Sequence, residues 1–235
     1  MNKAKFFKKA FLTFFLWLFF VPQSLAWHDE THAAISKAAG YKKWFNSAGA
    51  DMIKLKAGEI EYFNHFVNNP PETVITEKMV FEMVKRYNKI LDAGHLYGAI
   101  IASLRDYFQY IEKGKYGEYH LAFCAHYIGD LSQPLHNTMR NKFNEKYHVK
   151  IDNTVNDEVL ENIPNIKIYP ISLESEHDLA KEIARIANIS TKKGYQLERE
   201  NRLLTKDEAY EQISHSASLF KAVLKYIEKQ VGQKK

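Results

Sequence analysis

The chain has 235 residues, of which 46% are hydrophobic and 26% are charged, and its formal net charge is +5. Its single cysteine, Cys124, excludes an intramolecular disulfide, so packing or bound metal has to stabilise the fold. Four lysines and no acidic residue lie within residues 1–26. Residues 27–235 therefore lack the strong basic excess that would indicate nucleic-acid binding from charge alone.

The N-terminal segment has the pattern of a secretory signal. Its lysines precede an apolar run over residues 10–22, and Ser24-Leu25-Ala26 offers small residues where a signal peptidase cleaves. The apolar run is shorter than the roughly 20 residues that a membrane-spanning helix needs. We therefore expect residues 1–26 to be removed, leaving a secreted or periplasmic protein without a stable membrane anchor. An uncleaved anchor is the alternative.

Apolar residues recur at intervals of three and four along the rest of the chain, whereas β-type alternation is scarce, which is typical of amphipathic helices. The sequence predicts an all-α fold, a multi-helix bundle that forms one domain over residues 27–235. The predicted helices cover residues 29–40, 50–66, 76–91, 95–113, 117–132, 145–160, 174–197 and 205–230.

Histidines and carboxylates recur at metal-binding spacings in the middle of the chain. His126 and Asp130 lie four residues apart, so a helix presents both on one face. A proline then breaks or bends the helix, which lets His136 point elsewhere. His148 and Asp152 repeat the four-residue spacing. Together with His136 they offer two nitrogens and one oxygen with an open position, as in catalytic zinc sites.

Two further pairs lie upstream. Asp51 and His65 are separated by fourteen residues, or about four helical turns, so they could come from opposite ends of one helix. Trp27 would be the first residue after signal cleavage, with His32 close behind. An α-amine has a pKa of about 8, so a zinc ion can displace its proton and bind the amine nitrogen and the carbonyl oxygen of Trp27.

The run from His126 to His136 matches the signature His-Tyr-x-Gly-Asp-x-x-Gln-Pro-x-His without a gap. With Trp27 at the cleavage site, it makes residues 27–160 resemble the zinc-dependent phospholipase C and S1/P1 nuclease superfamily. The resemblance implies the helical fold of that superfamily and three zinc ions. The implied ligand sets are Asp51, His65, His126 and Asp130 for one ion, Trp27, His32 and a bridging Asp130 for the second, and His136, His148 and Asp152 for the third.

The resemblance also implies phosphodiester hydrolysis by a zinc-bound hydroxide. A bridging carboxylate can bring two ions about 3.5 to 4 Å apart, and metal charge lowers the pKa of a bound water toward about 7. Asp51 is the predicted catalytic residue, because it could orient or deprotonate that water. No organic cofactor is expected.

Some ligand assignments have rivals. Glu59 and Glu61 lie nearer to His65 than Asp51 does, and His28 competes with His32. Other histidines are isolated in the sequence and receive no role: His95, His120, His177 and His215.

The substrate class is predicted from the run that follows the signature. Residues 147–157 resemble bacterial phospholipase C, and the Trp-Asp pair typical of the nucleases is missing. Asp152, however, stands where a glutamate is common in the phospholipases. We expect a monomeric phospholipase C-type enzyme acting on a phospholipid phosphodiester. An S1/P1-type nuclease acting on single-stranded nucleic acid is one alternative, and a non-catalytic zinc-binding helical protein is another.

Overall fold

α-Helices build the described part of the chain, which comprises residues 27–50 and 59–232 and contains no strand, only an isolated β-bridge between Val67 and Gly94. This computed structural model confirms the all-α prediction. The predicted signal segment and Asp51 lie outside the described residues. The α-helices are α2 (Asp29–Ala39), α4 (Glu59–Tyr62), α5 (Glu77–Val84), α6 (Leu96–Glu112), α7 (Glu118–Leu131), α8 (Lys142–Asp152), α9 (Glu176–Glu200) and α10 (Lys206–Gly232). Short 3-10 helices are η1 (Trp44–Ala48), η2 (Pro134–Asn137) and η3 (Ile163–Asn165).

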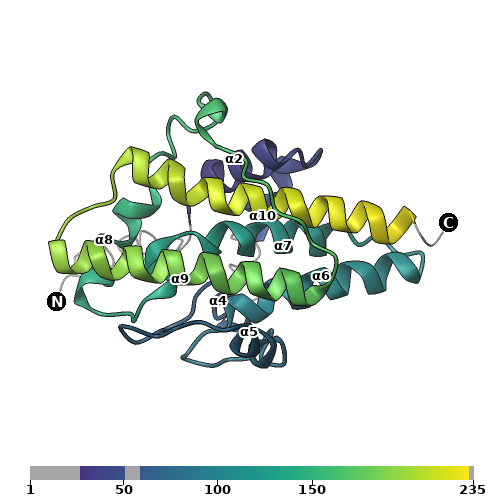
Figure 1. Cartoon of the computed structure of the whole chain (residues 1–235), viewed down its shortest axis with the longest axis horizontal. Coiled ribbons are helices and arrows are strands. Elements are labelled where there is room, and N and C mark those ends of the chain that lie inside the picture. Colours follow the sequence, from purple (N-terminus) through teal and green to yellow (C-terminus); the bar gives the residue numbers. More distant parts are fainter. Residues whose placement is uncertain (1–26, 51–58, 233–235) are drawn as a thin grey trace, which may run out of the picture.

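Helix α7 lies at the centre of the bundle. The long helices α9 and α10 run side by side across the front of the molecule, with α6 and α7 behind them (Figure 1). Every residue from His120 to Leu131 except Phe123 is buried, because α7 packs against α6, η1, α10, α2 and α9. A helix that is buried on all sides needs apolar or internally satisfied side chains around its whole circumference. Cys124 lies on α7, and burial raises the pKa of its thiol to about 12.

The buried apolar side chains form two clusters. One is built mainly from α6, α7, α9 and α10 and includes Leu131. The other contains Trp27 with parts of α2, α8 and α10 and includes Leu135. The segment from Asp130 to His136, the second half of the signature, therefore passes from one cluster to the other and contributes an apolar residue to each.

Helix α8 differs from its prediction at both ends. It begins at Lys142, earlier than expected, because Asn141 caps it by accepting hydrogen bonds from Phe143 N and Asn144 N, each at 3.0 Å. It ends at Asp152 and not near residue 160. There, Asn153 Nδ2 donates to a backbone carbonyl at 3.0 Å and Thr154 Oγ1 to another at 2.8 Å. Such side-chain bonds compete with the helical ones, and turns follow.

Helix α5 was also predicted too long. It ends at Val84, whereas the sequence predicted helix to residue 91. Asn88 adopts a left-handed backbone conformation with φ of 57°, and its N–H donates to Asn64 Oδ1 at 3.1 Å. A left-handed residue cannot continue an α-helix. The contact with Asn64 instead ties this turn to the segment that carries His65.

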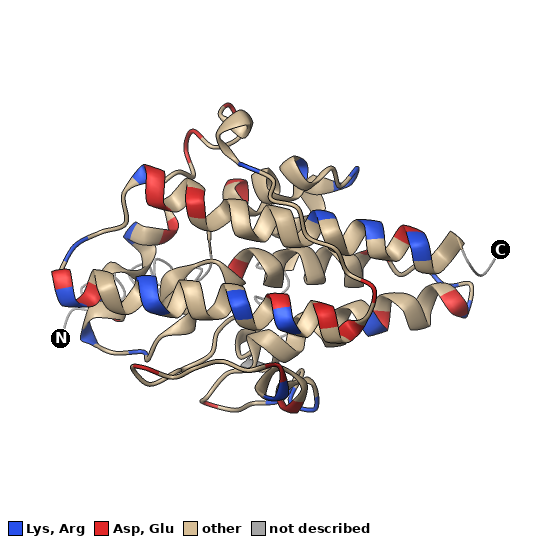
Figure 2. Cartoon of the chain, viewed as in Figure 1, with Lys and Arg blue, Asp and Glu red and all other residues tan. Residues whose placement is uncertain are grey.

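Charges of both signs alternate along α9 and α10 on the face shown in Figure 2. An ion pair connects the two helices directly, between Lys193 Nζ and Glu208 Oε1 at 2.9 Å. This face therefore offers no continuous basic track of the kind that follows a nucleic-acid backbone. Among the described helices, none combines the length and the apolar character needed to cross a bilayer.

Candidate metal centre

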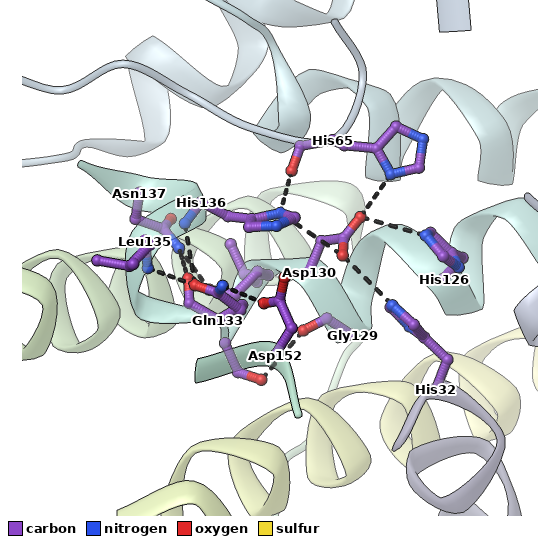
Figure 3. Close-up of polar contacts among 12 residues, drawn as sticks. His32, His65, His126, Gly129, Asp130, Gln133, Leu135, His136, Asn137 and Asp152 are labelled. Atoms are coloured by element: carbon purple, nitrogen blue, oxygen red, sulfur yellow. Dashed lines mark hydrogen bonds and ion pairs between the residues drawn. The ribbon is translucent and has the colours of Figure 1, made fainter. Parts of the chain in front are cut away.

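Asp130, in the last turn of α7, is the centre of the site (Figure 3). Its carboxylate is fully buried and faces four histidines from different parts of the chain. The Oδ1 atom lies 3.4 Å from His32 Nε2 and 3.5 Å from His136 Nδ1, and Oδ2 lies 2.8 Å from His65 Nδ1 and 3.4 Å from His126 Nε2. Each oxygen therefore faces its own pair of imidazoles.

Several of these separations suit a shared metal ion better than a hydrogen bond. Two ligands of one tetrahedral zinc, bound at about 2.0–2.1 Å, lie about 3.4 Å apart. The distances from Asp130 to His32 and to His126 are both 3.4 Å, longer than most N–H···O bonds. Asp130 Oδ1 is buried and accepts no hydrogen bond from the described residues, which is costly for a carboxylate unless a cation satisfies it.

His32, His126 and Asp130 form one buried group whose ligand atoms lie within 4.8 Å of one another. The resemblance seen in the sequence implied different zinc ions for the two histidines. In the structure their rings stack, with centroids 3.7 Å apart and an angle of 15° between the planes, so both Nε2 atoms reach the same carboxylate. Of the two rival histidines near the start of α2, the group contains His32, whereas His28 occupies the N-cap position of that helix.

His136, His148 and Asp152 form the second buried group, also within 4.8 Å. On α8, His148 Nε2 lies 3.5 Å from Asp152 Oδ2, as the four-residue spacing predicts. Gln133 links the two halves of this group. Its Nε2 donates to Asp152 Oδ1, while its Oε1 accepts from the backbone N–H of His136 at 3.1 Å.

Three of the histidines are oriented in the same way, because Nδ1 contacts an oxygen acceptor. The pairs are His126 with the Ser47 carbonyl at 2.8 Å, His136 with the His65 carbonyl at 2.5 Å, and His148 with Asn144 Oδ1 at 2.7 Å. A donor bond from Nδ1 fixes the tautomer and makes Nε2 the metal-binding nitrogen. The three rings are therefore held ready to present Nε2.

The electrostatics keep Asp130 ionised. Burial alone would raise the pKa of its carboxyl, but His126, His136, His32 and His65 together hold this pKa well below its usual range. A carboxylate that stays negative without solvent is a strong ligand for a divalent cation.

Gly129 matters for a steric reason that the sequence did not reveal. A Cβ atom at this position would lie 2.3 Å from His32 Nδ1, so only glycine lets the ring of His32 approach α7 this closely. Gln133 and Asn144 were also not identified as site residues. The glycine and the glutamine were visible in the signature, but their roles depend on segments distant in sequence.

A small cavity of about 100 Å³ opens beside the second group, next to His148. Tyr62, Phe66 and Leu135 form much of its wall, and Arg140 lies at the same opening. The Arg140 guanidinium is 5.9 Å from the centre of the Tyr62 ring and also donates to the Tyr62 hydroxyl. The opening thus combines aromatic surface with one cation and one carboxylate, that of Glu145.

Two other predicted ligands belong to neither three-residue group. His65 contacts Asp130, at 2.8 Å, and Trp27 is buried within the second apolar cluster. No protein-family model matches the chain, and no curated protein matches it either.

Proposed function

We propose that this chain is a zinc-dependent phosphodiester hydrolase. The observation that carries the proposal is the buried Asp130 carboxylate, which faces four histidines through its two oxygens. One of them, His136 at 3.5 Å, belongs to a second His-His-Asp group. Two adjacent groups of nitrogen and carboxylate ligands are the kind of site that phosphoric ester hydrolases use to hold paired metal ions.

In this proposal each residue has a defined task. His32, His126 and Asp130 hold one ion, and His136 and its two partners on α8 hold another. Zinc bound in such groups supplies a Lewis acid for phosphoryl oxygens and an activated water near neutral pH. The hydrogen bonds from Nδ1 keep the histidines in the ligating tautomer, and burial excludes bulk water. A third ion held by His65 and Asp51 is part of the proposal, as are the amine of Trp27 as a further ligand of the ion at His32 and Asp51 acting as the base.

For the substrate, we propose a phospholipid first. The run over residues 147–157 supports the phospholipase C type, and the wall formed by Tyr62, Phe66 and Leu135 offers apolar surface beside His148. The same cavity supports an S1/P1-type nuclease as the second candidate. Single-stranded nucleic acid needs an aromatic ring for a base and a cation for phosphate, and Arg140 lies against the Tyr62 ring.

The test uses the chain starting at Trp27, loaded with zinc and offered phosphatidylcholine vesicles and single-stranded DNA in parallel. His126→Ala serves as the inactive control. Cleavage of the lipid alone supports the phospholipase type, and cleavage of DNA alone supports the nuclease. If zinc is bound in full and neither phosphodiester is cleaved, the catalytic proposal fails and the non-catalytic alternative takes its place.

A further inference from the structure

His65 is oriented differently from His32 and His126, whose Nε2 atoms face Asp130. Its Nδ1 atom faces this carboxylate instead, at 2.8 Å from Oδ2. Its Nε2 atom lies 3.2 Å from Glu61 Oε1. The ring is thus held between two carboxylates, one on each of its nitrogen-bearing edges. The two nitrogens lie on different sides of the ring. An ion bound to Nδ1 beside Asp130 would therefore not contact Glu61, which faces Nε2.

Glu61 is buried, with 5% of its surface exposed, yet its carboxylate is surrounded by hydrogen-bond donors. The hydroxyl of Tyr127 donates to Oε1 at 2.6 Å, and Asn64 Nδ2 donates to Oε2 at 3.2 Å. Tyr127 comes from α7, one residue after His126. A buried carboxylate with several donors is satisfied without a metal ion of its own.

A further layer fixes Asn64. Its Oδ1 accepts from His95 Nε2 at 2.8 Å and from the backbone N–H of Asn88 at 3.1 Å, while its Nδ2 donates to Asn88 Oδ1 at 2.8 Å. Burial lowers the pKa of His95 to about 4, so at neutral pH this ring is uncharged. The contact with Asn88, in the turn after α5, therefore also determines which atoms of Asn64 face Glu61.

We propose that Glu61 is a positioning residue that accepts the Nε2 proton of His65 and thereby directs Nδ1 to the metal ion beside Asp130. A metal can bind Nδ1 only if the ring proton resides on Nε2, where Glu61 accepts it. This role differs from the one that the sequence left open, in which Glu61 replaces Asp51 as a direct ligand. The inference rests on the proposed function, because it presupposes an ion at Asp130.

Two variants of Glu61 test the role. Glu61→Gln keeps an oxygen acceptor for Nε2 but loses the charge, and Glu61→Ala removes the acceptor. Because outer-shell partners are worth about 10- to 100-fold in metal affinity, we expect about a tenfold loss of zinc affinity for Glu61→Gln and a loss near 100-fold for Glu61→Ala. Affinity is measured by competition with a chelator. Glu82→Gln on α5, whose side chain is 54% exposed, is the matched control and should leave zinc affinity unchanged.

The tautomer of His65 separates positioning from a merely structural role. Nitrogen NMR of the zinc-loaded protein should show metal on Nδ1 and the proton on Nε2 in the wild type, and a loss of this preference in Glu61→Ala. Tyr127→Phe, which removes one donor to Glu61, should shift zinc affinity in the same direction by less. It supplies the affinity test if the Glu61 variants do not fold.

The outcomes distinguish this inference from the proposed function. Loss of a whole zinc ion from Glu61→Gln, with the metal on Nε2 of His65 in the wild type, would make Glu61 a ligand and overturn the positioning role. Unchanged affinity and an unchanged tautomer in folded Glu61→Ala would overturn it as well. A wild-type protein that binds no zinc would defeat the proposed function before any variant is compared.

Discussion

At the scale of single residues, Asp130 is the side chain on which the site depends. It lies fully buried in α7, and each of its oxygens faces two histidines. Its negative charge is maintained by those imidazoles against the penalty of burial. Without the charge, the first group would retain two stacked histidines but no anionic ligand, and the nearby rings would lose their common partner.

Asp130→Asn keeps the shape of the side chain and removes its charge. We expect loss of at least one bound zinc ion and a fall in phosphodiester cleavage of more than about 100-fold, since even outer-shell partners are worth 10- to 100-fold. Metal analysis of the purified variant and the cleavage assay are the measurements. Asp157→Asn, at an exposed position, is the control, and equal zinc content in both variants would contradict the assignment.

Gly129→Ala tests the close approach of His32. The new Cβ would lie 2.3 Å from His32 Nδ1. Without this clash, alanine would stabilise the helix relative to glycine. We expect zinc to be lost from the first group and the metal-free protein to be destabilised by about 1–3 kcal/mol, as for overpacking in a core. Denaturant unfolding measures the second effect. Gly232→Ala, where a Cβ meets nothing within 4 Å, should show neither.

At the scale of elements, Gln133 joins α7, η2 and α8. Its amide begins η2 by accepting from the His136 N–H and also holds Asp152 of α8. We predict that Gln133→Ala weakens zinc binding at the second group by about 10- to 100-fold and leaves the first group occupied. Chelator titration should then show one weakened ion, and uniform loss from both groups would contradict this assignment.

Two helices at the centre of the bundle were predicted closely from their apolar periodicity. Residues 95–113 and 117–132 were predicted, and the structure has α6 at Leu96–Glu112 and α7 at Glu118–Leu131. The four-residue spacing of His148 and Asp152 likewise predicted that the two side chains meet on one face of α8. Three predicted ends were wrong. Helix was predicted to residues 66 and 91, but α4 ends at Tyr62 and α5 at Val84. α8 ends early because side chains, such as that of Asn153, bond to the backbone where apolar periodicity continues.

The arrangement of the site could be predicted only in part for a related reason. Spacing within one helix is visible in a sequence, whereas the stacking of His32 on His126 joins α2 to α7 and is not. The reversed orientation of His65 depends on contacts with Glu61 and, through Asn64, with a turn beyond α5. Tertiary contacts of this kind leave no periodic signal.

At the scale of the whole molecule, the metal-free protein should lose stability as the pH falls. The pKa of His95 is lowered to about 4 from an ordinary 6.5, so between these values the unfolded chain binds a proton that the folded chain does not. The free energy of unfolding then decreases as the pH falls from 6.5 toward 4, by up to about 1.4 kcal/mol per pH unit from this group.

Denaturant unfolding at several pH values with excess chelator measures this effect. His95→Gln retains a donor for Asn64 but has no titrating ring, so its stability should depend less steeply on pH than that of the wild type. Parallel pH profiles for the two proteins would show that His95 does not contribute.

The central claim is that two buried groups, connected by the signature segment, hold zinc. It is tested most directly by anomalous diffraction at the zinc edge on crystals of the zinc-loaded chain beginning at Trp27. We predict one anomalous peak among His32, His126 and Asp130 and another among His136, His148 and Asp152. Zinc peaks confined to surface residues, or no peak at either group, would contradict the account.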